Sequence, residues 1–116
     1  MILGVGVDMI EVARIKKAIE RNPRFCDKVF TPVEIAYSEG KASRFMHLAA
    51  RFAAKEAFIK AVGHRVPWAA VGVENLASGQ PLLWTADPSA TYGFSLAHVS
   101  LTHIADYAVA VVVLEK

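Results

Sequence analysis

The stretch Arg51-Phe52-Ala53-Ala54-Lys55-Glu56-Ala57-Phe58-Ile59-Lys60-Ala61 dominates the interpretation of this chain. Alanine, lysine, glutamate and phenylalanine fill it without glycine or proline, a composition that predicts a helix. Arg51 and Lys55 are four residues apart, so two like charges share one face, which is slightly unfavourable. Glu56 and Lys60 share another face, where opposite charges at this spacing stabilise each other. The segment fits either an amphipathic helix with surface salt bridges or a site for a cation and a polyanion.

Size and composition limit the classes of protein to consider. A chain of 116 residues has the length of one domain, and we expect residues 1–116 to form it. Hydrophobic residues make up 54%, an excess that predicts apolar surface hidden between subunits. The net charge of +2 and the absence of a long apolar run predict neither a nucleic-acid nor a membrane partner. The single cysteine, Cys26, has no internal disulfide partner, which predicts a cytoplasmic protein.

The hydrophobic pattern changes along the chain from a strand to helices and then to several strands. Thr31-Pro32-Val33-Glu34 has the composition of a helix start with a capping box, and Gly63 ends the long helix that follows. A continuous apolar run near the C-terminus predicts a strand buried on both faces. This order predicts an α+β fold with an antiparallel sheet packed against the long helix. The expected strands are residues 2–7, 71–76, 81–85, 98–102 and 107–114, and the expected helices are residues 10–22, 31–38 and 42–62.

Basic residues are concentrated in the first third of the chain. In the helix expected after the first strand, Val12, Ile15 and Ile19 form an apolar stripe, and basic side chains lie on the opposite side. Such a local excess of positive charge is typical of a surface that binds an acidic partner. The basic residues of this region are Arg14, Lys16, Lys17, Arg21, Arg24 and Lys28.

Two carboxylates are candidates for metal binding. Asp8 is expected at the end of the first strand, where it either caps the following helix or binds a partner or metal. Together with Glu56 it would offer hard oxygen ligands with open positions, a set that suits Mg²⁺ and substrate phosphates. Arg51, Lys55 and Lys60 would then face the phosphates.

The aromatic and histidine residues are harder to assign from sequence. His103 ends the segment Ser100-Leu101-Thr102-His103 and is either a half-exposed strand residue or part of a site. We interpret the remaining histidines as structural or solvated. Trp68 and Trp84 are isolated in the sequence, and we expect them in the core or at an interface.

The motifs together resemble those of the 4′-phosphopantetheinyl transferase family. Gly4-Val5-Gly6-Val7-Asp8-Met9-Ile10-Glu11 is similar to the G-x-D-(I/L)-x-E start of that family. The segment from Arg51 to Ala61 resembles its R-F-(A/x)-x-K-E-A-x-x-K-A signature. Gly79-Gln80-Pro81 is similar to its G-(K/R)-P turn, and His98-Val99-Ser100-Leu101-Thr102-His103 to its H-(V/L)-S-(I/L)-(S/T)-H strand. The length resembles that of the short holo-(acyl-carrier-protein) synthase branch.

The resemblance implies a Mg²⁺-dependent transferase. It would move the 4′-phosphopantetheine group from coenzyme A to a serine of apo-acyl-carrier protein, a step of fatty-acid biosynthesis that releases adenosine 3′,5′-bisphosphate. Asp8 and Glu56 would hold Mg²⁺, and either of them would accept the serine proton, Asp8 through a water molecule. Lys60 would stabilise the leaving group. The residues implied at the coenzyme A phosphates are Arg51, Lys60, Pro81, Thr102 and His103, and those implied at the carrier protein are Arg14, Arg21 and Arg24.

The resemblance also implies a homotrimer with sites between subunits, because the short branch supplies only half of a site per chain. Gln80 stands where the family turn carries a basic residue, and Gly63-His64-Arg65 replaces its common G-T-G. Two alternatives remain: another Mg²⁺-dependent enzyme of nucleotides, and a non-catalytic basic module that binds an acidic protein. Only the hypothesis of a non-catalytic module predicts that Asp8 and Glu56 are dispensable for function.

Overall fold

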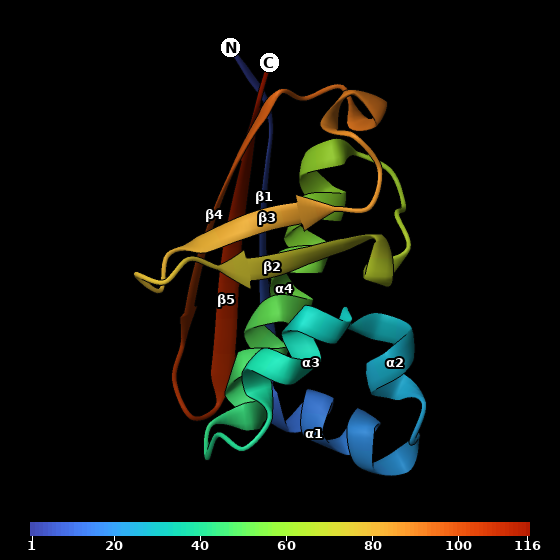
Figure 1. Ribbon diagram of the computed structural model, residues 1–116, viewed down its shortest axis with the longest axis vertical. Helices are drawn as coiled ribbons and strands as arrows, with labels where there is room; N and C mark the ends of the chain where they lie inside the picture. The colour runs from blue at the N-terminus through green and yellow to red at the C-terminus, as the bar shows by residue number, and fades with distance from the viewer.

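The computed structural model describes residues 1–116 and has the expected α+β fold. An antiparallel sheet of order β1-β5-β4 contains β1 (Ile2–Glu11), β4 (Leu96–His103) and β5 (Tyr107–Glu115). A separate antiparallel pair contains β2 (Val71–Asn75) and β3 (Pro81–Thr85). The long helix α4 (Arg44–Val62) packs against β1 and β5, and the β2–β3 pair crosses in front of it in Figure 1. The strands therefore form two sheets, with α4 common to both.

Three short helices gather at the end of the molecule opposite the chain termini (Figure 1): α1 (Val12–Arg21), α2 (Phe25–Val29) and α3 (Pro32–Ser38). The capping box of α3 is confirmed, because the Thr31 hydroxyl accepts from the Glu34 amide and the Glu34 carboxylate accepts from the Thr31 amide. Helix α2 was not expected, since five residues are too few to show a helical period. None of the helices combines the length and apolar character needed to cross a bilayer.

The two faces of the three-stranded sheet differ in burial. On the inner face of β5, Ala108, Ala110, Val112 and Leu114 are fully buried, and the strand packs there against α4. The alternate residues of β5 are only partly covered, so the prediction of a strand buried on both faces is wrong within one chain. The neighbouring β1 leaves apolar side chains exposed on the same outer face, namely Leu3, Val5, Val7 and Met9.

Small residues allow β1 to approach α4 closely. A Cβ atom added to Gly6 would overlap the Ala57 carbonyl oxygen, and one added to Gly4 would overlap the Ala61 carbonyl oxygen. Glycine is therefore required at these positions by the distance between strand and helix. This close crossing places Asp8 next to Lys60 of α4, and Glu56 lies one helical turn before Lys60 on the same helix face.

Candidate active site

Asp8 lies within β1, on the face directed at α4, and is paired there with a lysine. The Nζ atom of Lys60 donates to Asp8 Oδ1 at 3.1 Å and to the Val7 carbonyl oxygen at 2.9 Å. The strand continues to Glu11 because it pairs with β5 along its whole length, so the prediction that it ends at Val7 is wrong. Asp8 is not a helix cap either, since Glu11 occupies the N-cap position of α1.

Glu56 lies on the same side of α4 as Lys60, and two residues other than Lys60 contact its carboxylate. The Trp68 Nε1–H group donates to Glu56 Oε2 at 2.7 Å, and Arg65 Nη1 lies 3.7 Å from the same oxygen. The expected Glu56–Lys60 ion pair is not formed, because Lys60 pairs with Asp8 instead. Each carboxylate thus has its own protein partner, and both remain partly exposed, with 19% of the Asp8 and 25% of the Glu56 side chain accessible.

The donor set at this crossing fits Mg²⁺. The structure contains no cluster of three or more acidic, histidine or cysteine side chains that could enclose a metal ion. Two partly exposed carboxylates are nevertheless what Mg²⁺ commonly takes from a protein, because it fills its remaining positions with water and substrate phosphate oxygens. Asp8 and Glu56 could therefore hold this ion only together with an oxygen-rich substrate.

A second cluster lies around Arg51, where Tyr37, His47, Asn75, Pro81 and His103 line a surface cavity with it. Arg51 Nη2 donates to Asn75 Oδ1 at 2.8 Å and Nη1 donates to the His47 carbonyl at 3.2 Å. Its guanidinium carbon lies 4.4 Å from the centre of the Tyr37 ring. Burial lowers the pKa of Arg51. Its Nε atom is buried and has no hydrogen-bond acceptor. Arg51 takes part in no ion pair, so the cavity is lined by a fixed guanidinium without a counter-charge, which suits an anion.

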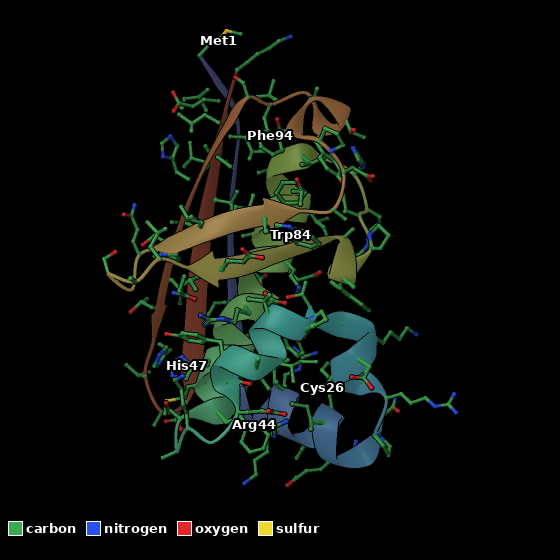
Figure 2. The ribbon with its side chains drawn as sticks, viewed as in Figure 1. Met1, Cys26, Arg44, His47, Trp84 and Phe94 are labelled. Atoms are coloured by element: carbon green, nitrogen blue, oxygen red, sulfur yellow. The ribbon has the colours of Figure 1, made fainter.

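Two histidines meet at the edge of this cavity. The rings of His47 and His103 are 5.3 Å apart between centroids and nearly perpendicular. Figure 2 shows His47 at the end of the molecule away from the termini, where β4 ends. Burial lowers the pKa of His47, and the nearby Arg51 charge lowers it further. Near neutral pH, His47 therefore contributes no positive charge of its own.

The residues predicted to bind coenzyme A do not all converge within one chain. Arg51, Pro81 and His103 share the cavity, whereas Thr102 points to the opposite face of β4 and lines a hollow with Met9 and Tyr107. Lys60 is nine residues from Arg51 on α4, which places the two side chains on opposite sides of a helix with about 3.6 residues per turn. The two clusters also lie at opposite edges of the sheet, because β1 and β4 flank β5.

Lys55 does not face a phosphate site, and that prediction is wrong. Its Nζ atom is fully buried and lies 2.7 Å from Glu34 Oε1. It also donates to the carbonyl oxygens of Trp68 at 3.0 Å and Val71 at 2.6 Å. Burial lowers the pKa of Lys55, and the adjacent Glu34 charge opposes this change. Arg51 and Lys55 therefore do not form a like-charge pair on the surface, because each side chain is buried and has its own partners inside the protein.

Arg14, Arg21 and Arg24 are all exposed, and none takes part in an ion pair. Val12 and Ile15 of α1 are buried on the other side of the helix, as the apolar stripe predicts. The three arginines are thus free to meet an acidic partner.

Sequence reasoning missed several residues of the two clusters. Trp68, interpreted as a core or interface residue, contacts a candidate metal ligand. His47 was interpreted as structural, and the roles of Tyr37 and Asn75 were not foreseen. No local signal identifies them, because each contacts α4 from a distant segment or from another turn of the helix.

Comparison with known proteins places this geometry in context. The family model described as the 4′-phosphopantetheinyl transferase superfamily matches residues 4–112. A holo-[acyl-carrier-protein] synthase from Solibacter usitatus is 45% identical over 125 aligned positions and is matched over 100% of both chains. One from Geobacter sulfurreducens is 40% identical, with 100% of this chain and 99% of that protein covered.

Solved structures give the same relationship at the level of the fold. The crystal structure of a holo-(acyl-carrier-protein) synthase from Bacillus anthracis in complex with CoA (3′,5′-ADP) has a TM-score of 0.85 and 38% sequence identity. The alignment covers 100% of this chain and 98% of that one. The holo-[acyl-carrier-protein] synthase from Neisseria meningitidis has a TM-score of 0.88 at 31% identity, with both chains fully covered.

Proposed function

Because the chain belongs to the 4′-phosphopantetheinyl transferase superfamily, we propose that it transfers 4′-phosphopantetheine from coenzyme A to a serine of apo-acyl-carrier protein. The products are holo-carrier protein and adenosine 3′,5′-bisphosphate, and the role lies in fatty-acid biosynthesis. The observation that carries the proposal is the crossing of β1 over α4, which bears Asp8, Glu56 and Lys60. These are two oxygen ligands and one cation at a partly exposed surface.

In the reaction, the serine oxygen attacks the β-phosphorus of coenzyme A while the bond to the bridging oxygen breaks. Asp8 and Glu56 would hold Mg²⁺, which when bound neutralises charge on the pyrophosphate. Lys60 stabilises the negative charge that develops on the leaving nucleotide. One of the two carboxylates accepts the serine proton. The remaining work of the chain is to hold the two reactants in line.

The nucleotide phosphates are assigned to Arg51, with Pro81 and His103 beside it. These residues lie across α4 from Lys60, so one chain does not offer one continuous site. A second chain that places its β4 edge against the β1 edge of the first would join the two clusters. Such a head-to-tail contact between unlike surfaces forms a ring when the rotation between neighbouring chains closes, and a rotation of one third of a turn gives a trimer. We therefore assign the protein to a homotrimer with three sites between subunits, in which Thr102 faces a neighbouring chain.

The outer face of the sheet supports this assembly. Val5, Val7 and Met9 are each more than half exposed in the isolated chain. They continue onto the partly covered valines of β5. An apolar sheet face of this kind is typical of surfaces that subunits bury. Trimer formation would also cover the second face of β5.

The carrier protein would dock on α1, where Arg14, Arg21 and Arg24 meet its acidic surface. Docking there would present the carrier serine to the crossing of β1 and α4. A cytoplasmic location forms part of the same proposal, in agreement with the single free thiol of Cys26.

The deciding experiment is mass spectrometry of an apo-acyl-carrier protein incubated with this protein, coenzyme A and Mg²⁺. We expect the carrier to gain the mass of one phosphopantetheine group. Glu56→Gln should abolish the gain, and Glu39→Gln, at an exposed glutamate of the α3 C-cap, should leave it intact. Binding of the carrier without any mass gain would instead favour a basic interaction module.

A further inference from the structure

The candidate metal ligand Glu56 is linked to the buried core through one of its protein partners. Both protein partners of Glu56 approach a single oxygen, Oε2: the Trp68 indole at 2.7 Å and the Arg65 guanidinium at 3.7 Å. The Oε1 atom has neither as a partner. The carboxylate is therefore oriented from one side and left open on the other.

The indole N–H is well suited to orient a metal ligand. It only donates a hydrogen bond, so it cannot coordinate a cation or change its charge with pH. A lysine or arginine in the same place would add a positive charge that competes with the metal ion. Arg65 is the weaker partner, because its distance is longer and 65% of its side chain is exposed. The indole is thus the group that determines the orientation of Glu56.

Trp68 is itself anchored by the buried ion pair. The Lys55 ammonium is fully buried and donates to the Trp68 carbonyl, the Val71 carbonyl and Glu34. Glu34 uses its second oxygen to accept from the Val73 amide at 2.9 Å. A buried charge that loses one of these partners is strongly unfavourable, so the backbone at the start of β2 has little freedom. The Phe52 ring, 5.8 Å from the Trp68 ring, fixes the indole from the side.

We propose that Trp68 is a positioning residue for the metal ligand Glu56, and that the buried Glu34–Lys55 pair holds Trp68 in place. The inference rests on the proposed function, because it requires Glu56 to bind a divalent cation. Its physical content is preorganisation: the indole holds Oε2 and leaves Oε1 without a protein partner before any ion arrives. Partners that orient a metal ligand through a hydrogen bond typically contribute a factor of about 10–100 in metal affinity.

The test measures Mn²⁺ binding by electron paramagnetic resonance in the presence of coenzyme A, alongside thermal unfolding. Trp68→Phe keeps an aromatic ring and removes the N–H donor, and we expect Mn²⁺ affinity to fall by about 10-fold or more. The half-saturating Mg²⁺ concentration in turnover should rise by a similar factor, with a smaller change in kcat at saturating Mg²⁺. Trp84→Phe is the matched control, because Trp84 lies on β3 (Figure 2) and donates no hydrogen bond to Glu56.

A second variant separates positioning from packing. Replacement of Trp68 by benzothienylalanine preserves the bicyclic shape and exchanges only the N–H group for sulfur. We expect this variant to unfold at the wild-type temperature and still to bind Mn²⁺ more weakly. Wild-type Mn²⁺ affinity in both Trp68 variants would overturn the proposal, whatever their thermal stability. If Glu56→Gln also bound Mn²⁺ like the wild type, the metal assignment of the proposed function would fail as well, which distinguishes the two failures.

Discussion

At the scale of single residues, the two candidate metal ligands are held in different ways. Asp8 is paired with a cation, Lys60, whose side chain is 56% exposed. Glu56 is held mainly by a neutral donor, Trp68. An incoming metal ion therefore competes with a closely paired cation at Asp8, 3.1 Å away, and with the more distant Arg65 guanidinium, 3.7 Å away, at Glu56. In the proposed reaction, Lys60 would leave Asp8, or share it, when the pyrophosphate of coenzyme A binds.

Lys60→Met should have opposite effects on metal binding and on turnover. Loss of the ammonium removes a competitor from Asp8, so Mn²⁺ should bind more tightly in the absence of coenzyme A. Turnover should fall by about 100-fold, since a charged group on the leaving oxygens is worth a few kcal/mol in the transition state. Metal titration and steady-state kinetics test the two parts separately. Lys28→Met, at an exposed residue of α2, is the control, and weaker metal binding in Lys60→Met would contradict this account.

His47 should make stability depend on pH in a defined window. Burial lowers the pKa of His47 in the folded state, with Arg51 and His103 contributing in the same direction. The unfolded chain then binds a proton more readily, so the free energy of unfolding falls as the pH drops below about 6.5. The loss ends once the pH is below the folded-state pKa, and above about 6.5 this histidine contributes no pH dependence.

Chemical denaturation at pH 7, 6 and 5 measures this effect, because the series runs from about half a unit above to about one and a half units below the pKa of an ordinary histidine. His47→Gln should lose less stability between neutral and mildly acidic pH than the wild type. His64→Gln, on the exposed loop after α4, serves as the control. Identical pH profiles for wild type and His47→Gln would show that this partly buried histidine does not cause the loss of stability at acidic pH.

At the scale of elements, the residues proposed for carrier docking and those proposed for chemistry lie on different helices, α1 and α4. Helix α1 buries Val12 and Ile15 and presents unpaired arginines to solvent. Helix α4 is buried on most of its surface and carries groups of both clusters on opposite sides. Substrate recognition and chemistry should therefore respond to different substitutions.

Arg14→Glu combined with Arg21→Glu should raise the KM for apo-carrier protein by about 10-fold or more, because complementary charge is replaced by repulsion. The KM for coenzyme A should change little. Raising the salt concentration should weaken the wild-type interaction in the same direction. Steady-state kinetics with each substrate varied in turn provides the measurement. Lys116→Glu, at the far end of the molecule, is the charge control, and an equal rise in both KM values would contradict a docking role.

Glu34→Gln should destabilise the protein by about 3–5 kcal/mol, because it leaves the fully buried Lys55 ammonium without a counter-charge. The double variant Glu34→Leu with Lys55→Met should recover much of this loss, since it removes both buried charges. Urea unfolding of the three proteins tests the prediction. Glu20→Gln, at an exposed residue of α1, should be nearly neutral. A loss below about 1 kcal/mol in Glu34→Gln would contradict a tight ion pair.

At the scale of the whole molecule, the isolated chain has two incomplete features that one assembly would complete. The cavity around Arg51, proposed to bind the nucleotide phosphates, and the Asp8–Glu56 carboxylates lie at opposite edges of the sheet. Its outer sheet face is apolar and uncovered. A ring of chains would bring the cavity of one chain next to the carboxylates of its neighbour. It would also bury the apolar outer face of the sheet.

Light scattering of the wild type should therefore give the mass of a trimer. Val7→Glu places a charge on the outer face of β1, where the side chain is 56% exposed, and should yield monomers with little transferase activity. Val33→Glu is the matched control, because Val33 on α3 is 48% exposed but lies away from the sheet. An active wild-type monomer would contradict the shared site.

Much of the fold follows from local signals. The capping box at Thr31, the glycine stop at Gly63 and the alternating strands predict element order and most boundaries, because each depends on neighbouring residues. The short helix α2 and the last residues of β1 do not follow, since their limits depend on packing and on pairing with β5. The family motifs identify Asp8, Glu56 and Lys60 as candidate site residues, but they do not show which side chains contact one another.

Charge and hydrophobicity in the sequence are sufficient to identify the α+β class and the basic face of α1, and the resemblance of its motifs identifies the family to which the chain belongs. They do not reveal which charges are buried. Lys55 and Arg51 look alike in the sequence, yet Lys55 is locked to Glu34 while Arg51 lines a cavity. The role of Trp68 likewise arises from the fold, which brings its indole to Glu56 across a separation of twelve residues. Side-chain partners between distant segments depend on how strands and helices cross, and that crossing here follows from the close contact of Gly6 with α4.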